Sequence, residues 1–207
     1  MFDKLKLEYR NPIRLSINDQ PVKMRTLLDL YISMGKDGYM FEGWLFNLDY
    51  SVIYLKEKDK WKKYYIPPNG IENYKILDVG GGCGETAKFF TDNGANFIDI
   101  IEPNSICWHY LEVNKKNHKK KIRNIIKTTF NPEEINFNEY DLVKLDIEGY
   151  EMDLLPFLEG ININIVLESH NLYTVNKFLK AGFKMFKEPP KNIQLYGLVT
   201  QLYKWVK

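Results

Sequence analysis

Three glycines at alternate positions form the part of the chain whose residue types and spacing best suit ligand binding. Gly80, Gly82 and Gly84 follow an apolar segment that contains Asp78, and a helical pattern begins directly after them. Glycine tolerates positive φ angles and has no Cβ, so a bound molecule can approach the backbone closely. This loop predicts a binding site for a nucleotide-like ligand between a strand and a helix. The alternative is a tight turn that binds nothing.

Glu102 is the expected partner of this loop. It directly follows an apolar segment, residues 97–101, which predicts the next strand of a parallel sheet. Wound sheets bind their ligands at the carboxyl ends of adjacent strands, and a carboxylate there is well placed to bind both hydroxyls of a ribose. We therefore expect one ligand to extend from the glycine loop to Glu102.

Two nucleotide-like ligands suit such a loop, and Asp78 distinguishes between them. Residues 82–87 also satisfy the loose dinucleotide pattern Gly-x-Gly-x-x-Gly/Ala, which would make the chain a nucleotide-dependent oxidoreductase. A carboxylate beside the loop disfavours a pyrophosphate but attracts the sulfonium and ammonium groups of S-adenosylmethionine. The order Asp-x-Gly-x-Gly-x-Gly over residues 78–84 also resembles the S-adenosylmethionine loop, so we predict that cofactor.

A second group of carboxylates follows a later apolar segment. Asp146 stands at the end of residues 141–145, a predicted strand, and Glu148 and Glu151 follow at the start of a predicted helix. Carboxylates at a helix N-terminus gain from the helix dipole and cap free N–H groups. The spacing alone therefore leaves a structural and a chemical role equally open.

Four segments, in the same order and spacing, resemble the FkbM-type methyltransferases. Residues 143–151, Val-Lys-Leu-Asp-Ile-Glu-Gly-Tyr-Glu, are similar to the family's Lys-x-Asp-x-Glu-Gly-x-Glu signature, the most specific of the four. Residues 78–84 resemble its opening loop, although Gly82 replaces an Asn that is often found there. Residues 101–104 resemble its Glu-Pro-Asn block, which Leu111 and Asn114 follow here. Residues 166–170 resemble its fifth strand, which ends in an acidic and His pair.

The resemblance covers residues 75–182, about half of the chain, and it implies a function. Members transfer a methyl group from S-adenosylmethionine, most often to a hydroxyl oxygen of a sugar, polyketide or similar small molecule. By position, the methionine part of the cofactor would contact Asp78, Gly80, Gly82 and Gly84. Glu102 would hold the ribose, Pro103 and Asn104 would line the adenosine side, and Thr129 would lie near the adenine.

The acceptor hydroxyl needs alignment and removal of its proton. A carboxylate is a poor base for an alcohol, because their pKa values differ by about ten units. Asp146 and Glu148 could instead orient the hydroxyl, accept its proton late, or hold a divalent cation. Because clustered carboxylates serve equally well as helix caps, we predict no metal site. His170 has a naturally suitable pKa for a base, or it is a loop histidine facing solvent.

The elements that must position these residues form a wound, mostly parallel sheet, because apolar strands alternate with helical patterns from Lys75 onward. The expected strands are residues 75–79, 97–101, 124–128, 141–145 and 163–168. The expected helices are residues 85–93, 105–120, 150–158 and 172–181. Two last strands, 183–187 and 198–206, have no helix between them and should form an antiparallel hairpin. Seven strands in this α/β, Rossmann-like arrangement are the inventory of the class I methyltransferase fold.

Residues 1–70 carry no recognisable motif and are expected to form an appendage to the main domain, 71–207. Residues 21–34 have the apolar spacing of an amphipathic helix. Residues 50–55 and 61–66 are rich in aromatic and β-branched side chains, with a polar segment between them, and predict a β-hairpin. We expect some of these aromatic side chains to close over the acceptor.

Composition narrows the function classes. Lys and Arg total 29 and Asp and Glu total 27, so the net charge of +2 does not require a polyanionic partner, and only four of the cations are Arg. Two cysteines exclude a disulfide scaffold and a Cys-based zinc cage. We expect a cytoplasmic protein without membrane contact, because no apolar run could cross a bilayer and no signal-peptide pattern is present.

A basic run leaves nucleic acid open as a less favoured partner. It consists of Lys115, Lys116, Lys119, Lys120, Lys121 and Arg123, and it suits the solvated end of a helix or a phosphate-rich substrate. The Asn/Asp-Pro-Pro-Tyr/Phe motif of base methyltransferases is replaced here by residues 146–149, which does not exclude methylation of an RNA ribose. A non-catalytic binding protein of the same fold is the remaining alternative.

Overall fold

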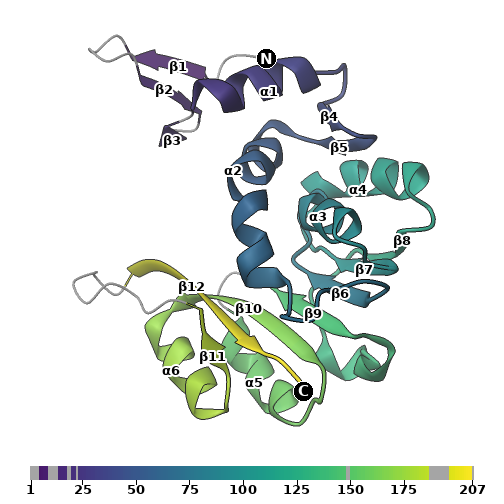
Figure 1. Cartoon of the computed structure of the whole chain (residues 1–207), viewed down its shortest axis with the longest axis vertical. Coiled ribbons are helices and arrows are strands. Elements are labelled where there is room, and N and C mark those ends of the chain that lie inside the picture. The colour runs from purple at the N-terminus through teal and green to yellow at the C-terminus, as the bar shows by residue number, and fades with distance from the viewer. Residues whose placement is uncertain are drawn as a thin grey trace.

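A seven-stranded sheet forms the centre of the computed structural model, which describes residues 5–8, 14–17, 20–21, 23–147, 150–186 and 196–206 (Figure 1). The strand order is β11-β12-β10-β9-β6-β7-β8. The strands are β6 (Lys75–Val79), β7 (Phe97–Ile101), β8 (Ile122–Ile126), β9 (Leu142–Leu145), β10 (Asn164–Asn171), β11 (Lys184–Met185) and β12 (Tyr196–Lys204). Strands β6 to β10 are parallel, and β12 is antiparallel to both of its neighbours. The predicted class I methyltransferase sheet, with its antiparallel C-terminal pair, is confirmed.

The order of the strands reverses beside β6. From β6 the chain continues outward through β7 and β8, and it then returns to place β9 on the other side of β6. The two connections leave a crevice between the carboxyl ends of β6 and β9. Open α/β sheets bind their ligands in this kind of crevice.

Helices cover both faces of the sheet, and its central strands β6, β7 and β9 are almost fully buried. One face packs against α2 (Leu48–Tyr65), α3 (Glu85–Asp92) and α4 (Ser105–Asn117), and the other against α5 (Glu151–Glu159) and α6 (Leu172–Lys180). Because successive side chains of a strand point to opposite faces, Ile76 belongs to the first core and Leu77 to the second. Burial on both faces explains the mostly apolar runs that predicted these strands.

The hairpin predicted for residues 50–55 and 61–66 is wrong, because this segment is the single helix α2. Asn47 caps the helix by accepting a hydrogen bond from the Tyr50 N–H at 3.0 Å. Tyr54, Trp61 and Tyr65 recur at helical spacing and are buried against the α3 side of the sheet. Packing of this aromatic face overrides the β propensity of its residues, which is a weak local preference.

The N-terminal region contains shorter elements. Strands β1 (Leu5–Glu8), β2 (Arg14–Ile17) and β3 (Gln20–Pro21) form a small antiparallel sheet, and α1 (Met24–Ser33) agrees with the predicted amphipathic helix. Strands β4 (Tyr39–Phe41) and β5 (Trp44–Phe46) form a hairpin that was not predicted. Its turn holds Glu42 and Gly43 at φ angles of 51° and 87°, as a two-residue hairpin turn requires. Within the described residues, no helix has the length and apolar character to cross a membrane.

Candidate functional site

A cavity of about 1060 Å³ opens at the carboxyl ends of the strands, where the strand order reverses. Most of the predicted site residues that the structure describes line it. These are Gly80, Gly82, Glu102, Pro103, Asn104, Thr129 and Asp146. Asp78 and Gly84 lie just outside the lining. Glu148 and the side chain of His170 fall outside the described part of the chain, so their predicted roles stay predictions.

The glycine loop is shaped by close backbone packing. Gly80 has a φ angle of 74°, and a Cβ atom on it would lie only 1.9 Å from the carbonyl oxygen of Asp146. Gly82 has a φ angle of 54°, and its Cβ would lie 2.4 Å from the ring of Tyr50. Any side chain at either position would meet atoms that are already packed, so the loop requires glycine for both conformation and space.

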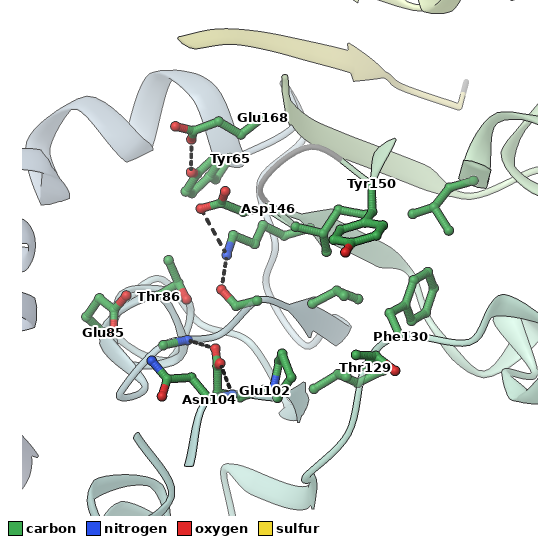
Figure 2. A pocket seen from close by; sticks show the side chains of 18 of the residues that line it. Tyr65, Glu85, Thr86, Glu102, Asn104, Thr129, Phe130, Asp146, Tyr150 and Glu168 are labelled. Carbon is green, nitrogen blue, oxygen red and sulfur yellow. Dashed lines mark hydrogen bonds and ion pairs between the residues drawn. The ribbon is translucent and has the colours of Figure 1, made fainter. Parts of the chain in front are cut away.

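Glu102 is held rigidly at the end of β7. Its Oε2 accepts a hydrogen bond from the Gly82 N–H and its Oε1 accepts one from the Asn104 N–H, both at 2.8 Å (Figure 2). Burial raises the pKa of Glu102, and the two N–H bonds oppose that rise. Each carboxylate oxygen has two acceptor sites, so Glu102 can also accept hydrogen bonds from a ligand in the cavity.

Replacing Glu102 with alanine is expected to weaken binding of S-adenosylhomocysteine by roughly 5- to 150-fold, equivalent to about 1–3 kcal/mol. The variant would leave the Gly82 N–H without its partner and would lose the charge-assisted bonds that the sequence analysis predicts between Glu102 and a ribose. Isothermal titration calorimetry would measure the affinity. Glu112→Ala is a suitable control, because Glu112 is exposed on α4 and pairs with Lys127. Equal affinity in the Glu102 variant and this control would contradict the assignment.

A buried lysine, to which the sequence analysis gave no role, joins the two acidic motifs. The Lys144 side chain on β9 is 2% exposed, and its Nζ donates a hydrogen bond to the Gly80 carbonyl oxygen at 2.7 Å. The same Nζ pairs with Asp78 at 3.2 Å and with Asp146 at 3.8 Å. Burial alone would lower the pKa of Lys144, but attraction to Asp78, Asp146 and Glu85 raises it overall. A lysine within an otherwise apolar, fully buried strand could have indicated from the sequence that Lys144 has buried partners.

Asp78 lies beneath the loop rather than at its surface. It is fully buried, and its Oδ2 accepts a hydrogen bond from the Thr86 hydroxyl at 2.5 Å. It stands opposite Lys144 in the parallel register of β6 and β9. Its carboxylate therefore fastens the glycine loop to α3 and to β9, and it influences the cavity through Lys144.

Asp146 directly follows β9 and Glu168 lies within β10, and both line the cavity (Figure 2). The Asp146 side chain is 29% exposed, and its backbone N–H donates to the Val79 carbonyl oxygen at 3.0 Å. The Tyr65 hydroxyl donates to the Glu168 carboxylate at 3.0 Å and so ties α2 to β10. Among the described residues, no three His, Cys, Asp or Glu side chains are grouped as a metal site would require.

Aromatic and acidic side chains dominate the rest of the lining. Tyr50, Trp61 and Tyr64 come from α2, and Phe130, Tyr150 and Phe157 face the cavity from the other side. The lining carboxylates are Glu57, Glu85, Glu102, Glu133, Asp146, Asp153 and Glu168. Lys144 is the one Lys or Arg in the described lining. The cavity is therefore strongly acidic and suited to cationic groups.

Asn114 on α4 supports the loop from behind. Its amide accepts a hydrogen bond from the Leu45 N–H at 2.6 Å and donates to the carbonyl oxygens of Leu45 at 3.0 Å and Cys83 at 2.9 Å. All three bonds are buried, and they join the β4–β5 hairpin, α4 and the glycine loop.

Replacing Asn114 with alanine is expected to lower the free energy of unfolding by roughly 2–3 kcal/mol, because three buried backbone groups lose their partner. Urea denaturation would measure the change. Asn117→Ala is a matched control on the same helix, since Asn117 makes a single exposed bond to the Gly43 carbonyl oxygen. Similar stabilities of the two variants would show that the buried Asn114 bonds are not important.

Comparison with known sequences gives one partial similarity. No model of a known protein family matches the chain. Protein arginine N-methyltransferase 8-B of Danio rerio is 29% identical over 126 residues, which are 61% of this chain and 27% of that protein. The chain thus spans about a quarter of the length of this curated relative.

Two solved structures are similar to this chain in fold. TYW2 of M. jannaschii, in complex with AdoMet, is 18% identical, has a TM-score of 0.51, and is matched over 82% of this chain and 85% of that one. A SAM-dependent methyltransferase of Leishmania major is 18% identical, has a TM-score of 0.50, and is matched over 76% of this chain and 74% of that one. At these identities the likeness shows that the chain has the class I methyltransferase fold.

Proposed function

We propose that this chain is an S-adenosylmethionine-dependent methyltransferase. The observation that carries the proposal is the convergence of Gly80, Gly82, Glu102 and Asn104 on one cavity at the reversal of the strand order. The acidic lining supports a cationic cofactor over a pyrophosphate. Two proteins of the same fold, a SAM-dependent methyltransferase and TYW2 in complex with AdoMet, support the same choice.

The described residues fit this cofactor part by part. Glu102 would bind the ribose hydroxyls, Asn104 and Pro103 would line the adenosine side, and Thr129 would lie near the adenine. The backbone of Gly80 and Gly82, which lines the cavity, would adjoin the methionine part. When bound, S-adenosylmethionine supplies a methyl group on a positively charged sulfur. The cavity reaches the upper end of the usual range for ligand sites, about 300–1000 Å³, which leaves space for an acceptor.

For the acceptor we propose a hydroxyl oxygen of a small molecule, as in the FkbM-type methyltransferases that the sequence resembles. Asp146 supports this proposal, because its partly exposed carboxylate lines the cavity beside Gly80. It would accept a hydrogen bond from the acceptor hydroxyl, orient its oxygen, and take the proton late in the transfer. The aromatic side chains of α2 would form the wall against which the acceptor packs.

A cationic amine or guanidinium is the second candidate acceptor, and the charge of the cavity favours it. Seven carboxylates line the cavity against one lysine, and several of them lie away from the predicted cofactor contacts. Glu57 on α2 and Asp153 on α5 belong to this group. Such a lining would attract a positively charged acceptor and could accept a proton from it.

The placement of the basic run supports a small acceptor over a nucleic acid. The run extends from the end of α4 to the start of β8. It therefore lies at the amino ends of the strands, whereas the cavity opens at their carboxyl ends. Two of its members have protein partners. Lys121 donates to the Ala95 carbonyl oxygen at 2.6 Å, and Arg123 binds the Asp99 carboxylate.

Calorimetric titration of the purified chain with S-adenosylmethionine, S-adenosylhomocysteine and NAD(H) tests the cofactor. Micromolar binding of the first two and none of the third is expected, and binding of NAD(H) alone would overturn the proposal. Incubation with alcohols and amines of matched carbon skeleton, followed by mass spectrometry of the products, would then separate the two acceptor classes. Cofactor binding without any methylated product would favour a non-catalytic binding protein.

A further inference from the structure

Glu85 is a buried carboxylate that the predicted site does not use. It is the first residue of α3, directly after the glycine loop, and it lines the cavity with only 6% of its surface exposed. Its Oε2 atom is buried and has no hydrogen-bond partner among the residues that the structure describes. A buried carboxylate oxygen without a donor is costly, so this atom indicates a ligand that supplies one.

The surroundings of Glu85 define the donor that is missing. The side chain lies over Gly82, where a Cβ atom would meet its Oε1 at 2.6 Å and its Oε2 at 2.9 Å. Burial raises the pKa of Glu85 most, and Asp78 and Cys107 raise it further, while its own backbone N–H and Lys144 oppose the rise. A positively charged N–H donor in the cavity would stabilise the ionised carboxylate, and none of the described side chains does so at bonding distance.

The position of Glu85 along the cavity indicates which part of the ligand it would contact. Figure 2 shows Glu85 and Thr129 on opposite sides, with Glu102 between them. If the ribose lies on Glu102 and the adenine near Thr129, as the proposed function requires, the amino-acid part of the ligand extends toward Glu85. That part carries an α-ammonium group, which offers three charged N–H donors.

We infer that Glu85 binds the α-ammonium group of the methionine part of the cofactor, an inference that rests on the proposed function. The bond is a charge-assisted N–H···O contact to Oε2, the atom that otherwise has no donor. Glu85 thereby acts as a specificity residue, which selects nucleoside ligands that carry an amino acid. The same carboxylate destabilises the ligand-free protein as the pH rises above its unfolded pKa of about 4.3, because folding raises its pKa and so disfavours the ionised form.

A thermodynamic cycle tests this inference with two ligands and two forms of the protein. The ligands are S-adenosylhomocysteine and its analogue without the α-amino group, and the proteins are the natural chain and Glu85→Gln, titrated by calorimetry. The natural chain is expected to bind the analogue roughly 10- to 150-fold more weakly. Glu85→Gln is expected to weaken binding of S-adenosylhomocysteine by a similar factor and binding of the analogue by less than about twofold. Glu159→Gln is the control, since Glu159 is exposed at the end of α5.

The outcomes separate the inference from the proposed function. If the natural chain binds neither ligand, the proposed function fails and the inference fails with it. If it binds both ligands equally well, the inference alone is overturned, and this result does not depend on how the variant folds. If folded Glu85→Gln protein bound neither ligand, the inference would also be overturned, because Glu85 would then only shape the loop. A higher midpoint of thermal unfolding for ligand-free Glu85→Gln at pH 7 is expected in addition, and a lower midpoint would contradict the cost assigned to Glu85.

Discussion

Replacing Lys144 with methionine is expected to lower the free energy of unfolding by about 3–5 kcal/mol. The Nζ of Lys144 bonds the Gly80 carbonyl oxygen and pairs with the carboxylates of Asp78 and Asp146. Methionine fills similar space but leaves the fully buried Asp78 without a countercharge. A loss of this size is a large part of the stability of a typical domain, about 5–15 kcal/mol. Urea denaturation followed by circular dichroism would measure it.

Two further variants make this prediction specific. Lys116→Met changes an exposed lysine of α4 and should alter the stability by less than about 0.5 kcal/mol. Adding Asp78→Asn to Lys144→Met removes the unpaired carboxylate and should recover part of the loss. If Lys144→Met were as stable as Lys116→Met, the buried ion pairs would not contribute as described.

The pH dependence follows from the direction of the Lys144 pKa. The folded state raises this pKa above the unfolded value of about 10.4, so the stabilisation is fully present below that pH. It is lost as the pH rises through the folded pKa. The stability difference between the natural chain and Lys144→Met should therefore decrease as the pH rises into the strongly alkaline range.

Replacing Asp146 with asparagine is expected to lower turnover by about 100-fold or more, the usual contribution of a positioned acid or base. Asparagine has nearly the same shape, and the backbone contacts of this residue with Val79 and Gly80 are unchanged. The substitution removes the charge of its partly exposed pair with Lys144 at 3.8 Å. The fold and the affinity for S-adenosylhomocysteine should therefore change little. Steady-state rates with an accepted substrate would measure kcat, and calorimetry would measure the affinity.

Asp59→Asn serves as the control for this variant, because Asp59 is exposed on α2 and lies outside the cavity lining. A decrease in kcat for Asp146→Asn alone would support its role at the acceptor. Full activity of Asp146→Asn on the acceptor would show that another group orients the hydroxyl. Glu148 and His170 would then be the next residues to substitute.

The sequence by itself determined the sheet and the position of the cavity. Strands β6 and β7 begin and end at the predicted residues, 75–79 and 97–101, because strands buried on both faces are mostly apolar. The glycine loop and Glu102 were also predictable. The spacing of the glycines is a local pattern, and the order of strands and helices brings the carboxyl ends of β6 and β7 together.

Only the tertiary structure decided the conformation of α2 and the charges of the cavity. The aromatic residues of α2 have β propensity, and they form a helix because their buried face packs on α3 and the sheet. The contact between Lys144 and Asp78 depends on the register of β6 with β9, and the bond between Tyr65 and Glu168 joins residues 103 positions apart. The burial of Glu85 likewise depends on what the fold places around it. Such contacts form between segments distant in the chain, and local spacing contains no information about them.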